Sequence, residues 1–159
     1  MATLLITYYS RTGHTAKMAE HIAEGARTVE GVEVQVRPVA EVTPQDLLKV
    51  DGVVMGSPVY YGTMAADLKT LIDESVAHHG RLEGKVGAAF ASSGGPGGGN
   101  ETTILSLLQA MLIHGMIVQG DPKGDHYGAV AVGEPDERSR DQCLRQGRRV
   151  AELVKRIAG

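Results

Sequence analysis

Hydroxyl side chains and a glycine follow the first apolar segment of the chain. Thr3–Tyr9 is short and β-branched, as expected for a buried strand, and Ser10-Arg11-Thr12-Gly13-His14-Thr15 comes directly after it. A helical pattern begins near Gly13, and unpaired N–H groups at a helix start favour an anion. The segment lacks the Gly-Lys-Ser/Thr ending of a triphosphate loop. It therefore predicts a metal-free site for a phosphate monoester, or else a plain helix cap by Ser10 or Thr12.

Two adjacent tyrosines follow another buried segment. Val53–Gly56 is apolar and is followed by Ser57-Pro58-Val59-Tyr60-Tyr61-Gly62-Thr63, in a chain with only 4% aromatic residues. An aromatic side chain at the end of a strand can lie against a flat ring system. Either tyrosine can instead pack within the protein or face solvent.

A third unusual segment is rich in serine and glycine. Val86–Ala91 is apolar and is followed by Ser92-Ser93-Gly94-Gly95-Pro96-Gly97-Gly98-Gly99, after which a helical pattern begins. The backbone N–H groups of such a segment can surround a planar ligand, although a flexible surface loop is the alternative. Because it joins a buried strand to an amphipathic helix, we expect a strand-to-helix loop rather than a linker.

Strand and helix patterns alternate along the whole chain, which predicts one α/β domain over residues 1–159 with a parallel sheet covered on both faces. Ligands bind to such sheets beyond the carboxyl ends of the strands, so the three loops should meet there. The other expected strands are Val32–Val39 and Met116–Val118, the latter resuming at Ala129–Val132. The expected helices are Gly13–Ala26, a brief one opened by Thr43-Pro44, and those carrying Met64–Ile72, Ile104–Leu112 and Leu144–Ile157.

Composition limits the partners. The formal net charge is −3, and Arg145, Arg148 and Arg149 are best interpreted as the solvated face of a helix, which disfavours nucleic acid. Cys143 is the only cysteine, so no intramolecular disulfide forms, and it should be buried. Neither a signal peptide nor an apolar run of the roughly 20 residues that cross a bilayer is present. We therefore expect a cytoplasmic protein without a membrane partner.

Taken together, the motifs resemble a known family. Tyr8–Thr15 resembles the phosphate-binding signature of flavodoxins and their relatives. Gly56–Met64 and Ser92–Thr103 are similar to the WrbA-type NAD(P)H:quinone oxidoreductases and allied FMN reductases, as are His114-Gly115-Met116 and Tyr127-Gly128-Ala129. The resemblance covers almost the whole chain. It implies a flavodoxin-like, doubly wound, five-stranded parallel sheet of order 2-1-3-4-5.

The same resemblance implies a bound FMN, with the phosphate held by the first loop and the isoalloxazine ring between the other two. The chain differs from the WrbA branch at Thr12, where that branch carries an aromatic residue, and it contains no tryptophan. The residues implied for FMN binding are Ser10, Arg11, Thr12, Gly13, His14, Thr15, Ser57, Pro58, Val59, Tyr60, Tyr61, Gly62, Ser92, Ser93, Gly94, Gly95, Gly97, Gly98 and His114.

His114 is the one candidate catalytic side chain. It could donate a hydrogen bond or a proton near the flavin as the acceptor is reduced. The alternative is structural, because His114 precedes Gly115 and a histidine in the last turn before a glycine cap is common.

The function implied by the resemblance is electron transfer from NADH or NADPH, through FMN, to a quinone or a similar flat acceptor. The same branch implies a homodimer or homotetramer. The alternative is a flavodoxin-type electron carrier, which is usually markedly acidic, unlike this chain. A phosphate-accepting receiver is disfavoured, because Tyr8-Tyr9-Ser10 stand where acidic residues would be needed.

Overall fold

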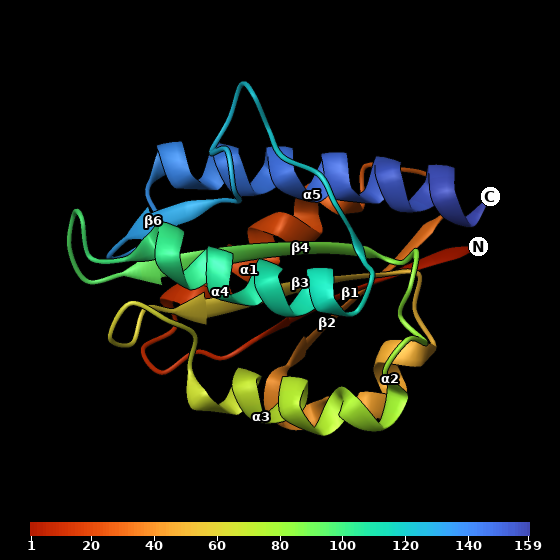
Figure 1. The fold of residues 1–159 in the computed structure, drawn as a ribbon. Coiled ribbons are helices and arrows are strands. Elements are labelled where there is room, and N and C mark those ends of the chain that lie inside the picture. Colours follow the sequence, from red (N-terminus) through yellow and green to blue (C-terminus); the bar gives the residue numbers. More distant parts are fainter.

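All strands of the central sheet run parallel to one another in the computed structural model, which describes residues 1–159. Their order is β2-β1-β3-β4-β5, and β6 also pairs with β4, so the expected order is confirmed (Figure 1). The fifth position is divided between two short strands, as the resumed pattern predicted. The strands are β1 Ala2–Tyr8, β2 Val32–Pro38, β3 Gly52–Pro58, β4 Val86–Ser93, β5 Ile117–Val118 and β6 Val130–Val132.

Helices cover both faces of the sheet. Helices α1 (His14–Ala26) and α5 (Glu137–Ala158) lie on one face, whereas α3 (Ala66–Glu74) and α4 (Asn100–Ile113) lie on the other (Figure 1). The short α2 (Pro44–Leu48) and two 3-10 helices, η1 (Val39–Glu41) and η2 (Ser75–His78), complete the α3 side. Each face has its own apolar core, and successive residues of β1 alternate between the two cores.

Local sequence signals explain several boundaries. Thr43 caps α2 in a reciprocal capping box with Asp46, and Pro44 occupies the first helical position, as expected. The backbone amide and side chain of Thr43 hold the pKa of the Asp46 carboxyl below its usual range. Cys143 is fully buried in α5, and burial raises the pKa of its thiol to about 12. No helix is both long enough and apolar enough to cross a membrane.

Two glycines allow α1 and α5 to cross in backbone contact. A Cβ atom added at Gly25 would lie 2.0 Å from the carbonyl oxygen of Leu144, and one at Gly147 would lie 1.9 Å from that of Ile22. Neither position has room for a side chain, so the two helices touch through their main chains. This contact fixes the position of α1, whose amino end follows the first predicted loop.

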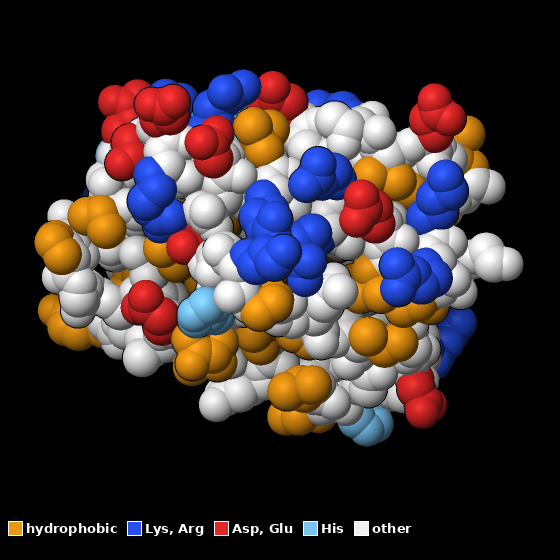
Figure 2. All heavy atoms as spheres, turned by 90° about the horizontal axis from the view of Figure 1, so that it is seen from above, with side chains coloured by type: hydrophobic (Ala, Val, Ile, Leu, Met, Phe, Trp, Pro, Cys, Tyr) orange, Lys and Arg blue, Asp and Glu red, His pale blue; other side chains and the backbone are white.

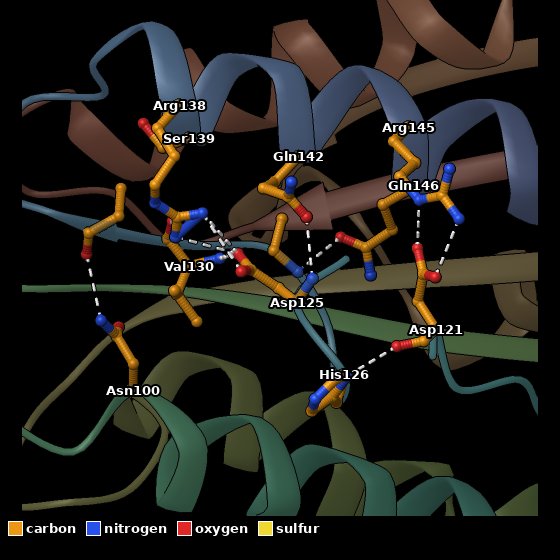
Figure 3. A network of polar contacts seen from close by, with 12 residues as sticks. Asn100, Asp121, Asp125, His126, Val130, Arg138, Ser139, Gln142, Arg145 and Gln146 are labelled. Atoms are coloured by element: carbon orange, nitrogen blue, oxygen red, sulfur yellow. Dashed lines mark hydrogen bonds and ion pairs between the residues drawn. The ribbon is translucent and has the colours of Figure 1, made fainter. Parts of the chain in front are cut away.

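The connection between β5 and β6 lies against α5 through polar side chains (Figure 3). Asp121 accepts hydrogen bonds from the Arg145 guanidinium, with Nη2–Oδ1 at 2.9 Å, and pairs with Arg149. Asp125 binds Arg138 at 3.1 Å. Arg145 and Arg149 are therefore partly buried ion-pair partners rather than a purely solvated face. Around them, basic and acidic side chains are interspersed on this side of the molecule (Figure 2).

The α1–α5 contact predicts the effect of one substitution. In an ordinary helix, Gly147→Ala would stabilise the protein by about 1 kcal/mol through helix propensity. Here the added methyl group overlaps the Ile22 carbonyl, so we expect a loss of about 1–3 kcal/mol in the free energy of unfolding. Urea unfolding measures this loss, and the neighbouring exposed variant Arg148→Ala should change it by less than about 0.5 kcal/mol. A stabilised Gly147→Ala protein would contradict the contact.

Candidate functional site

The three predicted loops meet at one edge of the sheet. Tyr8 pairs with Gly56, and Pro58 pairs with Ser92, so β1, β3 and β4 end side by side. The backbone pairing continues past the strands, because the Tyr9 amide donates to Gly56 at 3.1 Å and the Val59 amide donates to Ser92 at 2.8 Å. This edge is where doubly wound sheets bind ligands.

Ser10 organises the first loop. Its Oγ accepts hydrogen bonds from the amides of Gly13 and Ala16, both at 3.2 Å, and Gly13 adopts a positive φ of 97°. The amides of Arg11 and Thr12 donate to no group of the chain. Further first-turn amides of α1 also lack helical acceptors. Ser10 thus caps the helix, as in the alternative interpretation, and leaves several N–H donors of the loop and the first turn free.

A buried hydroxyl pair joins the first loop to the end of β4. Thr15 Oγ1 and Ser92 Oγ lie 2.9 Å apart, and both residues are almost fully buried. Thr15 therefore holds α1 against the third loop and does not face solvent, whereas Thr12 is exposed. Of the three predicted hydroxyl residues, Ser10 caps α1, Thr15 joins α1 to β4, and Thr12 is exposed.

The two tyrosines of the second loop have different surroundings. Tyr60 and Thr63 exchange backbone hydrogen bonds at 3.0 and 3.2 Å, which closes a tight turn with positive φ at Tyr61 and Gly62. The Tyr60 ring packs edge to face on Tyr9, with centroids 6.2 Å apart. Tyr61 is fully exposed at the tip of the turn. Tyr60 therefore packs within the protein, whereas Tyr61 faces solvent.

The serine–glycine loop is attached at both ends. Ser93 Oγ donates to the carbonyl of Gly95 at 3.0 Å and accepts from Asn100 Nδ2 at 3.0 Å. Thr102 Oγ1 lies 2.6 Å from the Gly62 carbonyl, so α4 also holds the tyrosine turn. Between these points, Gly94, Gly95 and Gly97 have open space around them.

Sequence reasoning missed some residues that shape this edge. Asn100 and Thr102 are polar residues in the first turn of α4, which is a recognisable helix-start signal. A fourth loop arrives after β6, where the Gly133 amide donates to Ser93 at 2.7 Å. Next to Gly133, Glu134 pairs with Lys17 of α1 at 2.9 Å. The resumed strand pattern before Gly133 could have indicated this loop.

The expectation for His114 requires correction. Helix α4 starts at the loop edge with Asn100 and runs back along the sheet for 14 residues, about 20 Å at roughly 1.5 Å per residue. His114 follows its last turn and lies at the opposite edge, where its Nε2 is 2.8 Å from Ser75 Oγ. Within one chain, it cannot touch a ligand held by the three loops. Its position agrees with the alternative interpretation as a residue of the helix end.

The surroundings of His114 disfavour its charged form. The Ser75 hydroxyl donates to the Ile72 carbonyl at 2.6 Å, so His114 Nε2 must carry the proton that binds Ser75. His114 Nδ1 is buried and has no partner. Burial, followed by the nearby His79, lowers the pKa of His114.

Comparisons with known proteins agree with this geometry. The family model of NADPH-dependent FMN reductases matches residues 37–124. A flavodoxin of Aquifex aeolicus is 44% identical over 162 residues, covering 97% of this chain and 88% of its own. An NAD(P)H dehydrogenase (quinone) of Archaeoglobus fulgidus is 35% identical over 191 residues, covering 99% and 100%. A WrbA-like protein from Agrobacterium tumefaciens has the same fold, with a TM-score of 0.83 at 22% identity and 99% of both chains covered.

Removing the Thr15 hydroxyl should destabilise the protein. Thr15→Val keeps the shape of the side chain but leaves Ser92 Oγ buried without its partner, which should cost about 1–2 kcal/mol of unfolding free energy. Chemical denaturation measures the loss. The exposed variant Thr12→Val is the matched control, and equal stabilities of the two variants would contradict a role for the buried pair.

His114 should make the protein less stable in mild acid. Its folded pKa lies below the unfolded value of about 6.5, so the unfolded chain takes up more protons as the pH falls below that value. The stabilising contribution is complete above about pH 6.5 and is lost progressively toward the folded pKa. Urea unfolding between about pH 5 and 8 should show this slope, and His114→Gln should reduce it. An unchanged slope in that variant would contradict the assignment.

Proposed function

The chain belongs to the NADPH-dependent FMN reductase family of flavodoxin-like proteins, and from that membership we propose that it passes electrons from NADH or NADPH, through FMN, to a quinone or a similar flat acceptor. Membership rests on the family model and on two relatives at 44% and 35% identity. The relative named as a quinone dehydrogenase supports the choice of acceptor.

The observation that carries the proposal is the group of unpartnered amides in the first loop. Arg11 and Thr12 present free N–H groups beside the amino end of α1, and this donor set suits a dianionic phosphate. Ser10 holds the loop in this shape before any ligand arrives, because its Oγ already binds two amides. Ser10 to Thr15 would therefore hold the FMN phosphate.

The other two loops suit the flat part of the cofactor. Pro58 to Gly62 would lie on one side of the isoalloxazine ring, and Ser92 to Gly98 would lie on the other. The open surroundings of Gly94 and Gly95 let backbone N–H groups approach a ring, and the exposed Tyr61 adds an aromatic surface. When bound, FMN supplies the electron-transfer chemistry, while these residues orient it and exclude water.

We propose a single domain and an assembly of identical subunits as part of this function. Leu112 and Ile113 at the end of α4 are exposed, as is Val76 of η2. Large apolar side chains grouped on a surface are typical of subunit contacts.

An electron carrier is the second candidate, because the relative with 44% identity is named as a flavodoxin. The two functions differ in steady-state turnover. With FMN bound, the proposed enzyme should oxidise NADH or NADPH rapidly and only when benzoquinone is added. Negligible oxidation by protein that has bound FMN would favour the carrier.

Phosphate recognition should dominate flavin affinity. Riboflavin lacks the phosphate and should bind at least about 100-fold more weakly than FMN, which corresponds to about 2.7 kcal/mol. Quenching of flavin fluorescence on titration with protein measures both constants. Ser10→Ala should weaken FMN binding but leave riboflavin binding nearly unchanged. Equal affinity for the two flavins would refute the phosphate site.

A further inference from the structure

A hollow lies next to the phosphate loop. It measures about 460 Å³ and is bordered by the ends of β1 and β2, by η1 and by the start of α3. One wall consists of Ser10, Arg11 and Gly13 of the phosphate loop together with Ala16 of α1. The opposite wall consists of Pro38–Ala40 and Asp67, which belong to none of the three loops assigned to FMN. The hollow is therefore a neighbouring space with a wall of its own.

The side chains of this hollow are unusual for a surface depression. Arg11 and Asp67 both border it, and neither has an ion-pair or hydrogen-bond partner in the chain. Tyr8 and Tyr9 also line it. Four of the five tyrosines in the chain, which has no tryptophan, collect at this edge of the sheet: Tyr8, Tyr9, Tyr60 and Tyr61.

We propose that this hollow binds the adenosine half of the nicotinamide donor. Each part of that ligand has a matching group: Arg11 for a phosphate, Asp67 for ribose hydroxyls, and the Tyr9 ring for the adenine base. The assignment rests on the proposed function, in which NADH or NADPH is the donor.

Tyr9 links the hollow to the second FMN loop. Tyr9 borders the hollow, and its ring contacts Tyr60 of the second FMN loop with centroids 6.2 Å apart. Tyr61 extends the aromatic surface to the tip of that loop. One extended dinucleotide can therefore follow Tyr9 and Tyr60 from the hollow to the flavin edge, with its phosphates passing Arg11.

Charge around the hollow bears on the choice between the two donors. Asp67 stands on one wall, and the pKa of Tyr8 is raised first by burial and then by the carboxylates Glu20 and Glu41. Arg11 is the only basic side chain that borders the hollow. The carboxylate of Asp67 suits a ribose diol, whereas the 2′-phosphate of NADPH would be repelled.

Filling the hollow tests the proposal. Ala40 is exposed on its far wall, and Ala40→Phe should raise the KM for NADH at least about 5-fold. The same variant should leave kcat/KM unchanged for reduced nicotinamide mononucleotide, which lacks the adenosine half. Ala158→Phe, at another exposed alanine at the end of α5, is the matched control and should resemble the parent. Equal losses with both donors, or no loss with NADH, would overturn the proposal.

Two binding measurements separate this proposal from the function on which it rests. ADP-ribose should bind to the parent protein in calorimetry and at least about 5-fold more weakly to Ala40→Phe, even if no turnover is found. FMN affinity should be the same in both, whereas a large loss in Ala40→Phe would mean that the hollow holds FMN and would overturn the proposal. Asp67→Asn should raise the ratio of kcat/KM for NADPH to that for NADH several-fold. A ratio that is unchanged or lower would exclude the assigned ribose contact.

Discussion

The parallel register of β1, β3 and β4 is the constraint on which the site depends. Each strand ends at the same edge, and the helix that follows it starts there. Gly56 lies beside Phe90 of β4 just before the loops and has no room for a side chain, because a Cβ atom there would lie 2.0 Å from the Phe90 ring. A slip of one residue would turn the side chains of a strand to the other face and separate Thr15 from Ser92.

Much of this arrangement could be predicted from the sequence because it depends on local signals. Buried strands are apolar and short, helices show their period, and Thr43-Pro44 marks a helix start. The converging loops follow from one topological rule, since consecutive strand-to-helix connections of a parallel sheet all lie at its carboxyl edge. Ser10, Tyr60 and Ser92 were therefore predicted to meet, although nothing in the sequence relates them directly.

The remaining features depend on contacts between distant segments. Asp121 pairs with Arg145, and Lys17 pairs with Glu134, but no periodicity marks either pair. Arg145 was expected to be solvated for that reason. The expectation for His114 failed for a different reason. The family resemblance suggested a role near the flavin, but α4 runs away from the loops and places His114 at the far edge of the sheet.

The strand pairing on the outer side of β4 is interrupted in the middle of the strand. β5 pairs only with Val86 and Gly87, and β6 pairs only with Ala91 to Ser93, so the middle of β4 has no strand partner on that side. Gln146 of α5 fills the gap by donating to the Ala89 carbonyl at 2.8 Å. α5 also holds the β5–β6 connection through the ion pairs of Arg145 with Asp121 and of Arg138 with Asp125. The fourth loop is tied to the cofactor loops instead, because its Gly133 amide donates to Ser93 and its Glu134 pairs with Lys17 of α1. Sequence change in the fourth loop would therefore also act on the first and third loops.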